Sequence, residues 1–339
     1  MKIVIPTYGR VERQQTFMTL AHDLRKDVVF AVRPDEQREF GRTYPKNELF
    51  VLPSDVRDIG ATRQHVLDRF GDERFIMSDD DITSFRRREL DPRVGFTTST
   101  LDTEDGQREM LDAIVSELET GVSIVTPSPG GHVPNMSHWP KRSAANALVF
   151  LAIDGPSVRG KGCCYRLDYG EDVDFVLQVL SSGLDCVQLS RFIYMVELGG
   201  SGGIGSMFSE DERQAMLESY HRKMLELWPD HVVLDGGQLS IERARLFDEA
   251  LAREGKKREV GKRGRPKKDP SFNGVTYESE SSTPVLILAG PKMAAYVLQT
   301  AGDRVAIMEP QPHRVYRTER FAVEKTDVRD DGIVVVGDD

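Results

Sequence analysis

The strongest constraint on the fold is a short stretch in which an apolar run ends in three carboxylates. Phe75-Ile76-Met77, a run typical of a buried strand, is followed after one serine by Asp79-Asp80-Asp81. Adjacent carboxylates repel one another unless positive charge lies among them. A hard divalent cation such as Mn²⁺ or Mg²⁺ would supply that charge, because it prefers carboxylate oxygens. The alternative is a solvated acidic turn in which Asp81 caps a helix.

The segments around this stretch predict an α/β fold. Strand-type runs and segments with helical spacing alternate over residues 2–6, 11–24, 27–32, 50–53, 59–70 and 74–78. Such alternation is typical of a layered α/β sheet. Ligands of open α/β sheets bind beyond the carboxyl ends of the strands. We therefore expect Thr7, Arg10 and the three aspartates to share one crevice.

The same patterns continue to about residue 230. Helices are predicted at 104–120, where Gly121 ends the helix, after Gly170, and from a Ser209–Glu212 capping box to Trp228. Further strands are predicted at 122–125, 147–153, 185–189 and 192–195. The glycine-rich run 199–205 favours either a mobile lid or a plain flexible connector.

The length of 339 residues predicts more than one domain. We expect a catalytic domain at 1–235, a helix and basic linker at 236–274, and a small α+β region at 275–339, with strands at 285–288, 305–308 and 333–336 and a helix at 292–300. No apolar run approaches a membrane span, and the first residues lack the features of a signal peptide. The three cysteines form no pairing framework. A cytoplasmic protein with reduced thiols and no membrane partner is the expectation.

Positive charge is concentrated in one tract. Residues 256–268 carry a net +7, so the rest of the chain carries −17 of the total of −10. Within the tract, Arg263-Gly264-Arg265-Pro266-Lys267 resembles an AT-hook. Glycine and proline favour a thin extended backbone there, and arginines enter the narrow minor groove of A·T-rich DNA. A solvated basic linker or a targeting signal is the alternative.

Four segments of the N-terminal part, taken in order, resemble the GT-A-fold glycosyltransferases, especially their family-2-like members. They are Val4-Ile5-Pro6-Thr7-Tyr8-Gly9-Arg10, Asp58-Ile59-Gly60-Ala61-Thr62-Arg63, Asp79-Asp80-Asp81 and Gly170-Glu171-Asp172-Val173-Asp174. They look like the nucleotide-binding loop, the Gly-x-x-x-Arg segment, the DXD motif and the segment that carries the catalytic base. The resemblance covers residues 1 to about 230 and implies a GT-A domain.

The resemblance also implies roles for individual residues. Donor-binding residues would be Pro6, Thr7, Tyr8, Arg10, Asp58, Gly60, Arg63, Asp79 and Asp80. The metal ligands would be Asp79 and Asp81, with His221 as a third. A metal would stabilise the leaving diphosphate as a Lewis acid. A carboxylate, Asp172 or else Glu171, would take the proton of the acceptor hydroxyl.

Each of these residues also has a structural alternative. Acidic residues suit a helix N-terminus, arginines form structural ion pairs, and His221 fits an ordinary surface position.

The whole chain looks like the phage DNA glycosyltransferases associated with base-hydroxylating dioxygenases. That resemblance implies transfer from a UDP-sugar to 5-hydroxymethylcytosine, or 5-hydroxymethyluracil, in DNA inside the host cytoplasm. The base would be flipped out of the stack. Two other functions stay open: a glycosyltransferase acting on a surface glycan or small molecule, and a non-catalytic DNA-binding protein.

Overall fold

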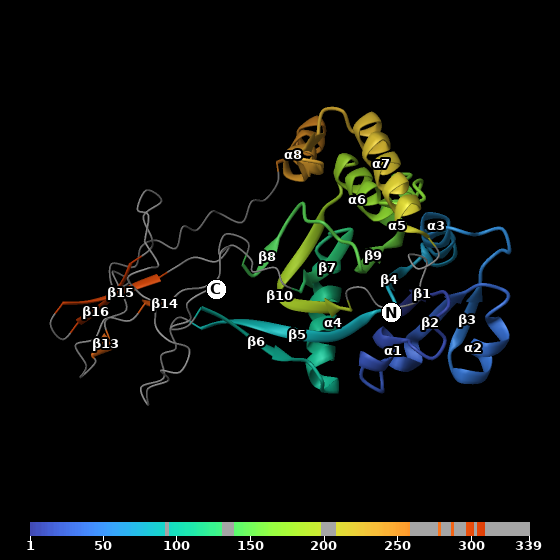
Figure 1. Ribbon diagram of the computed structural model, residues 1–339, viewed down its shortest axis with the longest axis horizontal. Coiled ribbons are helices and arrows are strands. Elements are labelled where there is room, and N and C mark those ends of the chain that lie inside the picture. Colours follow the sequence, from blue (N-terminus) through green and yellow to red (C-terminus); the bar gives the residue numbers. More distant parts are fainter. Residues whose placement is uncertain are drawn as a thin grey trace. The chain divides into compact units, whose positions relative to one another are not determined.

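The computed structural model describes residues 1–91, 95–130, 139–197 and 208–257, and beyond them 277–278, 286–287, 296–301 and 304–308. The chain divides into two compact units, Met1–Arg263 and Gly264–Asp339. The first unit is built on a ten-stranded sheet and the second on a four-stranded sheet (Figure 1). Within the described residues, no helix is long and apolar enough to cross a membrane.

The strands of the large sheet follow the order β3-β2-β1-β4-β9-β7-β10-β5-β6, with β8 paired to β10. They are β1 (Lys2–Pro6), β2 (Val28–Val32), β3 (Glu48–Val51), β4 (Arg74–Ser78), β5 (Ile82–Asp91), β6 (Gly95–Thr100), β7 (Ile124–Pro129), β8 (Lys141–Arg142), β9 (Phe150–Asp154) and β10 (Cys186–Val196). Strands β1 to β4 run parallel, and β9 is antiparallel to both β4 and β7. The predicted α/β fold is therefore confirmed, and the carboxyl ends of β1 and β4 lie side by side.

Helices cover both faces of this sheet. They are α1 (Gln15–Thr19), α2 (Gln37–Thr43), α3 (Ile59–Phe70), α4 (Glu104–Glu119), α5 (Gly155–Gly160), α6 (Glu171–Ser181), α7 (Glu210–Leu227) and α8 (Arg243–Arg253). Apolar residues of α3, α6 and α8 pack in one core, and those of α2 and α4 pack in the other. In Figure 1, α6 to α8 lie above the sheet, whereas α1, α2 and α4 lie below it. Strand β2 is buried along its whole length because it is covered on both faces.

Local signals in the sequence place several helix ends. The Ser209 side chain accepts a hydrogen bond from the Glu212 amide while the Glu212 carboxylate accepts one from the Ser209 amide, so the predicted capping box begins α7. Gly121, in the left-handed region with φ of 94°, follows the end of α4 as predicted. A short hairpin, β11 (Val232–Asp235) and β12 (Gln238–Ile241), then connects α7 to α8.

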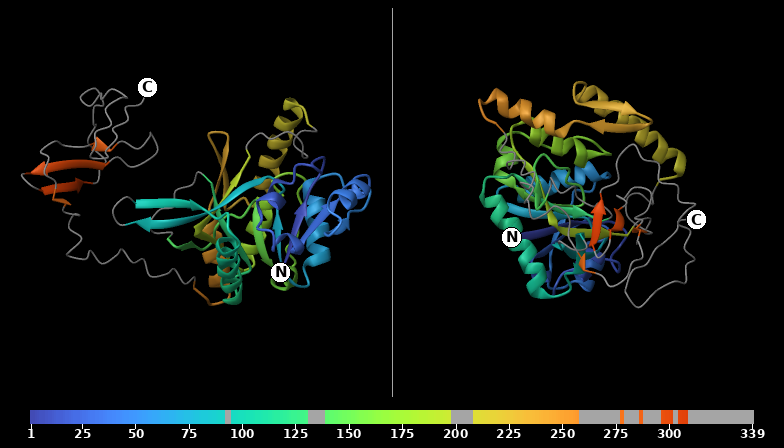
Figure 2. Two further views of the ribbon diagram at one scale, coloured as in Figure 1. Left: turned by 90° about the horizontal axis from the view of Figure 1, so that it is seen from below. Right: turned by 90° about the vertical axis from the view of Figure 1, so that its left-hand side faces the viewer.

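Parts of the large sheet and its helices differ from the prediction. The helix predicted at 11–24 is confined to α1, because the residues before it form a loop instead. In that loop Gln14 donates to Thr7, and Arg10 pairs with Asp80 after β4. The runs 185–189 and 192–195 belong to one strand, β10, with a register shift between Leu189 and Ile193. The two-stranded ribbon β5–β6 was not predicted, and it extends from the body of the first unit (Figure 2).

The second unit contains four short strands among its described residues. They are β13 (Tyr277–Glu278), β14 (Leu286–Ile287), β15 (Tyr296–Ala301) and β16 (Arg304–Met308). The helix predicted at 292–300 is wrong at its C-terminal half, since β15 pairs antiparallel with β16 there. Aromatic and β-branched residues such as Tyr296 and Val297 favour a strand over a helix. The strand predicted at 333–336 lies outside the described residues.

Candidate active site

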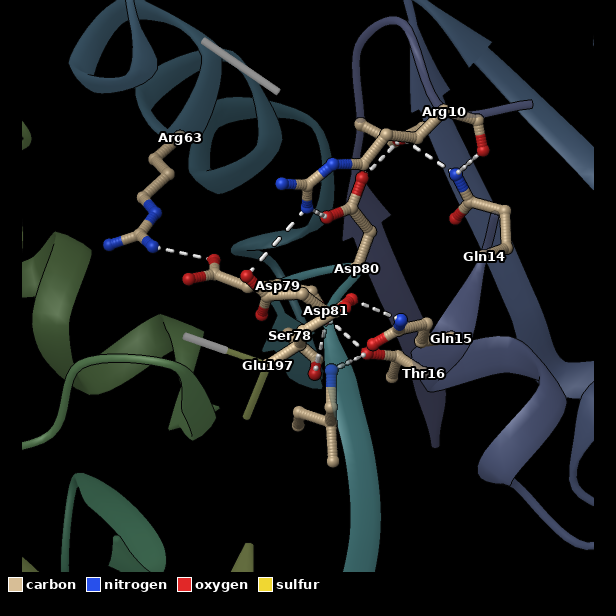
Figure 3. A network of polar contacts seen from close by, with 12 residues as sticks. Arg10, Gln14, Gln15, Thr16, Arg63, Ser78, Asp79, Asp80, Asp81 and Glu197 are labelled. Carbon is tan, nitrogen blue, oxygen red and sulfur yellow. Dashed lines mark hydrogen bonds and ion pairs between the residues drawn. The ribbon is translucent and has the colours of Figure 1, made fainter. Parts of the chain in front are cut away.

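The three aspartates follow β4 and point in different directions (Figure 3). The carboxylate of Asp80 points toward the loop after β1, where it accepts a hydrogen bond from Thr7 Oγ1 at 2.6 Å and pairs with Arg10 Nη1 at 2.5 Å. Gln14 supports this loop by donating to Thr7 Oγ1 and to the Arg10 carbonyl. Burial raises the pKa of Asp80, although the hydrogen bond from Thr7 and the charge of Arg10 oppose the shift. Asp80 thus joins the loop after β1 to the end of β4.

Asp79 contacts a second arginine, Arg63, on the opposite side of the cluster. Arg63 Nη2 lies 2.7 Å from Asp79 Oδ1, and Arg63 Nη1 lies 3.0 Å from Glu171 Oε1 and 3.9 Å from Asp172 Oδ2. The Arg63 side chain is only 4% exposed. One buried guanidinium therefore connects the end of β4 to the first turn of α6.

Helix α3 positions Arg63, and two predicted donor-binding residues position α3. The Asp58 carboxylate caps this helix by accepting a hydrogen bond from the Ala61 amide at 2.7 Å. A Cβ atom on Gly60 would lie 1.8 Å from the Leu167 carbonyl oxygen, so only glycine permits this close packing. These contacts explain both residues structurally, and their contact with a donor stays a prediction.

Asp81 is the least closely paired aspartate of the cluster, since Asp80 and Asp79 lie 2.5 and 2.7 Å from their arginines. Its carboxylate is 30% exposed and lies 3.7 Å from Arg10 Nη1. Desolvation, followed by the negative charges of Asp79 and Asp80, raises the pKa of Asp81 to about 6. The sequence predicted positive charge among the aspartates, and Arg10 and Arg63 supply part of it. Two guanidiniums among three carboxylates leave negative charge at the exposed edge, which suits a cation.

The Glu171–Asp172 pair begins α6. Gly170 precedes it in the left-handed region, with φ of 68°, and a Cβ atom there would lie 2.0 Å from the Tyr220 ring. The Glu171 side chain is 6% exposed and the Asp172 side chain 21%. Desolvation raises the pKa of both carboxyls, while the charge of Arg63 opposes the shift. Asp172 is thus the more accessible member and the one farther from Arg63.

The last carboxylate of that segment, Asp174, is structural. It is fully buried and accepts hydrogen bonds from Arg166, Gln178 and Trp228, which join α6 to the segments before and after it. By contrast, Arg33 was not predicted. Its guanidinium lies 3.9 Å from the centre of the Tyr8 ring, beside the loop after β1, and no motif indicated this contact.

The remaining predicted residues lie elsewhere. Pro6 ends β1, in register with Ala31 of β2. His221 lies on α7 in a hollow that it lines with Glu218, Arg222, Leu225, Glu226 and Leu234. Within the described residues, no group of three or more His, Cys, Asp or Glu side chains is assembled for a metal. A role for His221 as third ligand stays a prediction. The AT-hook-like residues Arg263, Gly264, Arg265, Pro266 and Lys267 and the run 199–205 lie outside the described residues.

The fold and site together define a class of protein. A parallel-rich α/β sheet presents carboxylates and arginines at the carboxyl ends of β1 and β4. Arg63 connects them to a second pair of carboxylates, Glu171 and Asp172. This arrangement is expected of a glycosyl-transferring enzyme. The model of the TET-Associated Glycosyltransferase family, TAGT, matches residues 1–203. Because that match covers more than half of the chain, the protein belongs to the TET-associated glycosyltransferases, and the prediction of a glycosyltransferase is confirmed.

Known proteins similar to this chain include two phage enzymes. The beta-glucosyl-HMC-alpha-glucosyl-transferases of Enterobacteria phages T6 and T2 are each 24% identical over 243 residues, covering 67% of this chain and 82% of the relative. Among solved structures, S. aureus TarS 1–349 with UDP-GlcNAc has a TM-score of 0.42 and 13% identity, over 75% of this chain and 72% of that one. Glucosyl-3-phosphoglycerate synthase from Mycobacterium tuberculosis with Mn²⁺ and UDP has a TM-score of 0.41 and 10% identity, over 66% and 78%.

Proposed function

We propose that the protein transfers a sugar from a UDP-sugar to the hydroxyl of a hydroxymethylated pyrimidine in DNA, with 5-hydroxymethylcytosine as the first acceptor to test. The observation that carries the proposal is the contact of Arg63 with both Asp79 and the Glu171–Asp172 pair. Through that contact, Asp79 on the donor side and Asp172, the candidate base, lie close together, as a single-displacement transfer needs. Family membership and the names of the phage relatives support this acceptor class.

On the donor side, Asp79 and Asp81 are the candidate ligands of a divalent cation. The two side chains suit a divalent cation because both offer carboxylate oxygens. Asp81 is also partly exposed, and its pKa is raised, which a bound cation would reverse. Mn²⁺ or Mg²⁺ would act there as a Lewis acid for the leaving diphosphate. Arg10 adds fixed positive charge beside the same aspartates. Tyr8, with Arg33 against its ring, is the candidate platform for the donor base.

On the acceptor side, Asp172 takes the proton of the hydroxymethyl group in the proposed reaction. Its side chain is the more exposed of the two carboxylates, whereas Glu171 is buried in its contact with Arg63. Glu171 then acts mainly by holding Arg63, which in turn orients Asp172. The AT-hook-like tract would keep the duplex near the site at high effective concentration.

A second acceptor is favoured by the names of the phage relatives, which describe addition of glucose to an already glucosylated base. The same site would then act on the sugar hydroxyl of a glucosylated 5-hydroxymethylcytosine. The chemistry of donor departure and proton removal is unchanged, because the attacking group is again a hydroxyl.

The test compares three duplexes that carry cytosine, 5-hydroxymethylcytosine or its glucosylated form, each with Mn²⁺ and a panel of UDP-sugars. Digested nucleosides are analysed by mass spectrometry. A sugar-sized mass gain on one modified base, absent with Asp172→Asn and retained with Asp112→Asn on the exposed face of α4, supports the proposal. Donor hydrolysis without transfer to any duplex would instead favour a glycan or small-molecule acceptor.

A further inference from the structure

An exposed aromatic residue, Tyr169, directly precedes the segment that carries the candidate general base. Among the aromatic side chains of the first unit that the structure describes, Tyr169 alone is exposed, at 41%. Only Gly170 separates it from Glu171 and Asp172, which begin α6. The proposed mechanism does not use its ring. An open aromatic surface beside a reactive carboxylate is a candidate binding surface for the acceptor.

Contacts at three consecutive residues hold this segment against α7. Asp168 Oδ1 accepts a hydrogen bond from Lys223 Nζ at 2.8 Å. The ring centres of Tyr169 and Tyr220 lie 5.8 Å apart, with the ring planes nearly perpendicular at 80°. Tyr220 also packs so closely on Gly170 that a Cβ atom there would lie 2.0 Å from its ring. The ring of Tyr169 therefore has a defined position beside the start of α6.

The contact with Tyr220 leaves much of the Tyr169 ring available. An edge-to-face pair covers at most one face of either ring, and the exposure of Tyr169 shows that the rest of its surface is not covered by other side chains. Every nucleobase has a π-face that can stack on an aromatic ring. The ring of Tyr169 is thus suited to be a platform for a nucleobase.

Covalent geometry keeps this platform near Asp172. Tyr169 and Asp172 are three residues apart, so their Cα atoms are at most about 11 Å apart. Burial, and then the negative charge of Asp172, raise the pKa of Tyr220, the residue on which Tyr169 packs. The Asp172 side chain is itself 21% exposed. A nucleobase stacked on Tyr169 is therefore within reach of the Asp172 carboxylate.

We propose that Tyr169 stacks on the modified pyrimidine after it leaves the duplex, and so positions its hydroxymethyl group at Asp172. This inference rests on the proposed function and adds to it the residue that receives the acceptor. A base that is flipped out of a duplex loses its stacking on its neighbours. Stacking on an aromatic side chain offsets part of that loss.

The nucleobase of the donor is a less suitable occupant. Its candidate platform, Tyr8, lies in the loop after β1, which Asp80 joins to the end of β4. Tyr169 instead belongs to the segment of Glu171, which contacts Arg63 through Nη1, whereas Asp79 contacts the same guanidinium through Nη2. Arg63 therefore lies between the donor-side aspartates and the segment that presents Tyr169.

The experiment measures initial rates of the full chain on a duplex that carries one modified base. Tyr169→Leu removes the aromatic face but keeps an apolar contact for Tyr220, and Tyr169→Phe keeps the face. Val233→Ala is the control, because Val233 is 54% exposed on the hairpin after α7. Tyr169→Leu should raise the KM for the duplex about tenfold, as expected for loss of one stacked base, with the KM for UDP-sugar unchanged. Tyr169→Phe and Val233→Ala should match the wild type.

A fluorescence measurement separates stacking from a structural role. A 2-aminopurine next to the modified base becomes brighter when that base leaves the stack, so its signal with saturating protein and no donor reports flipping. Tyr169→Leu should lower this signal and Tyr169→Phe should retain it. An unchanged signal would overturn the inference even if kcat falls, because Tyr169 would then only support α6.

Two kinetic results would also overturn the inference. One is an unchanged duplex KM in Tyr169→Leu. The other is a raised KM for UDP-sugar in that variant, which would assign Tyr169 to the donor. Failure of the wild-type protein to modify any duplex would instead refute the proposed function itself.

Discussion

Arg63 is the residue whose removal tests the architecture of the site most directly. Arg63→Met keeps much of the side-chain volume but removes the charge that contacts Asp79, Glu171 and Asp172. Breaking a buried ion pair at one partner costs about 3–5 kcal/mol, because the other charge stays buried. For a domain of this size, each kcal/mol lowers the Tm by about 2–4 °C, so the expected loss is about 6–20 °C.

The loss should depend on pH in a definite direction. Without Arg63, the pKa of Glu171 in the folded protein rises further above its unfolded value, because Arg63 is the main opposing charge. A carboxyl with a raised folded pKa stabilises the fold below its unfolded pKa, and that stability is lost as the pH rises through the folded pKa. Arg63→Met should therefore be most destabilised near pH 8 and partly rescued near pH 5.

Urea denaturation followed by circular dichroism at pH 5 and pH 8 measures both effects. Arg159→Met is the control, because Arg159 pairs with the exposed Asp72 at the surface, where such pairs contribute less than about 1 kcal/mol. Adding Glu171→Gln to Arg63→Met should restore part of the stability, since it removes one buried charge. The reasoning is refuted if Arg63→Met loses less than about 1 kcal/mol at pH 8, or loses the same amount at both pH values.

Three further predictions concern the reaction, the helix that carries the base, and the metal. Asp172→Asn should lower kcat by about 10²–10⁴-fold, which is the usual contribution of a general base. Glu171→Gln should lower kcat less. Equal losses of kcat in rate assays would contradict the assignment of Asp172 as the base. Gly170→Ala should cost more than about 1 kcal/mol in urea melts, because alanine is disfavoured at its positive φ and its Cβ would overlap the Tyr220 ring. Mn²⁺ affinity in calorimetry should fall as the pH drops through about 6, where Asp81 becomes protonated, and Asp81→Ala should abolish this dependence; a flat profile for the wild type would argue against Asp81 as a ligand.

Local patterns in the sequence account for much of the fold. The apolar run before Asp79, the alternation of strands and helices, and the Ser209–Glu212 capping box all predicted elements that the structure contains. Each depends on residues close together in the chain, so a single sequence shows them. The β5–β6 ribbon was missed because charged and hydroxyl residues dominate it and give no apolar run.

The sequence by itself determined that a buried strand ends in three aspartates, that an α/β sheet surrounds it, and that a Glu-Asp pair begins a later helix. Only the tertiary structure decided that Asp80 turns to Arg10 and that Arg63 joins Asp79 to Glu171. It also decided that Asp81 has the longest ion pair of the three aspartates and a raised pKa. The physical reason is that a counter-ion is chosen by distance in space. Arg10 and Asp80 are 70 positions apart in the chain, and they come together only because β1 and β4 are neighbours in the sheet.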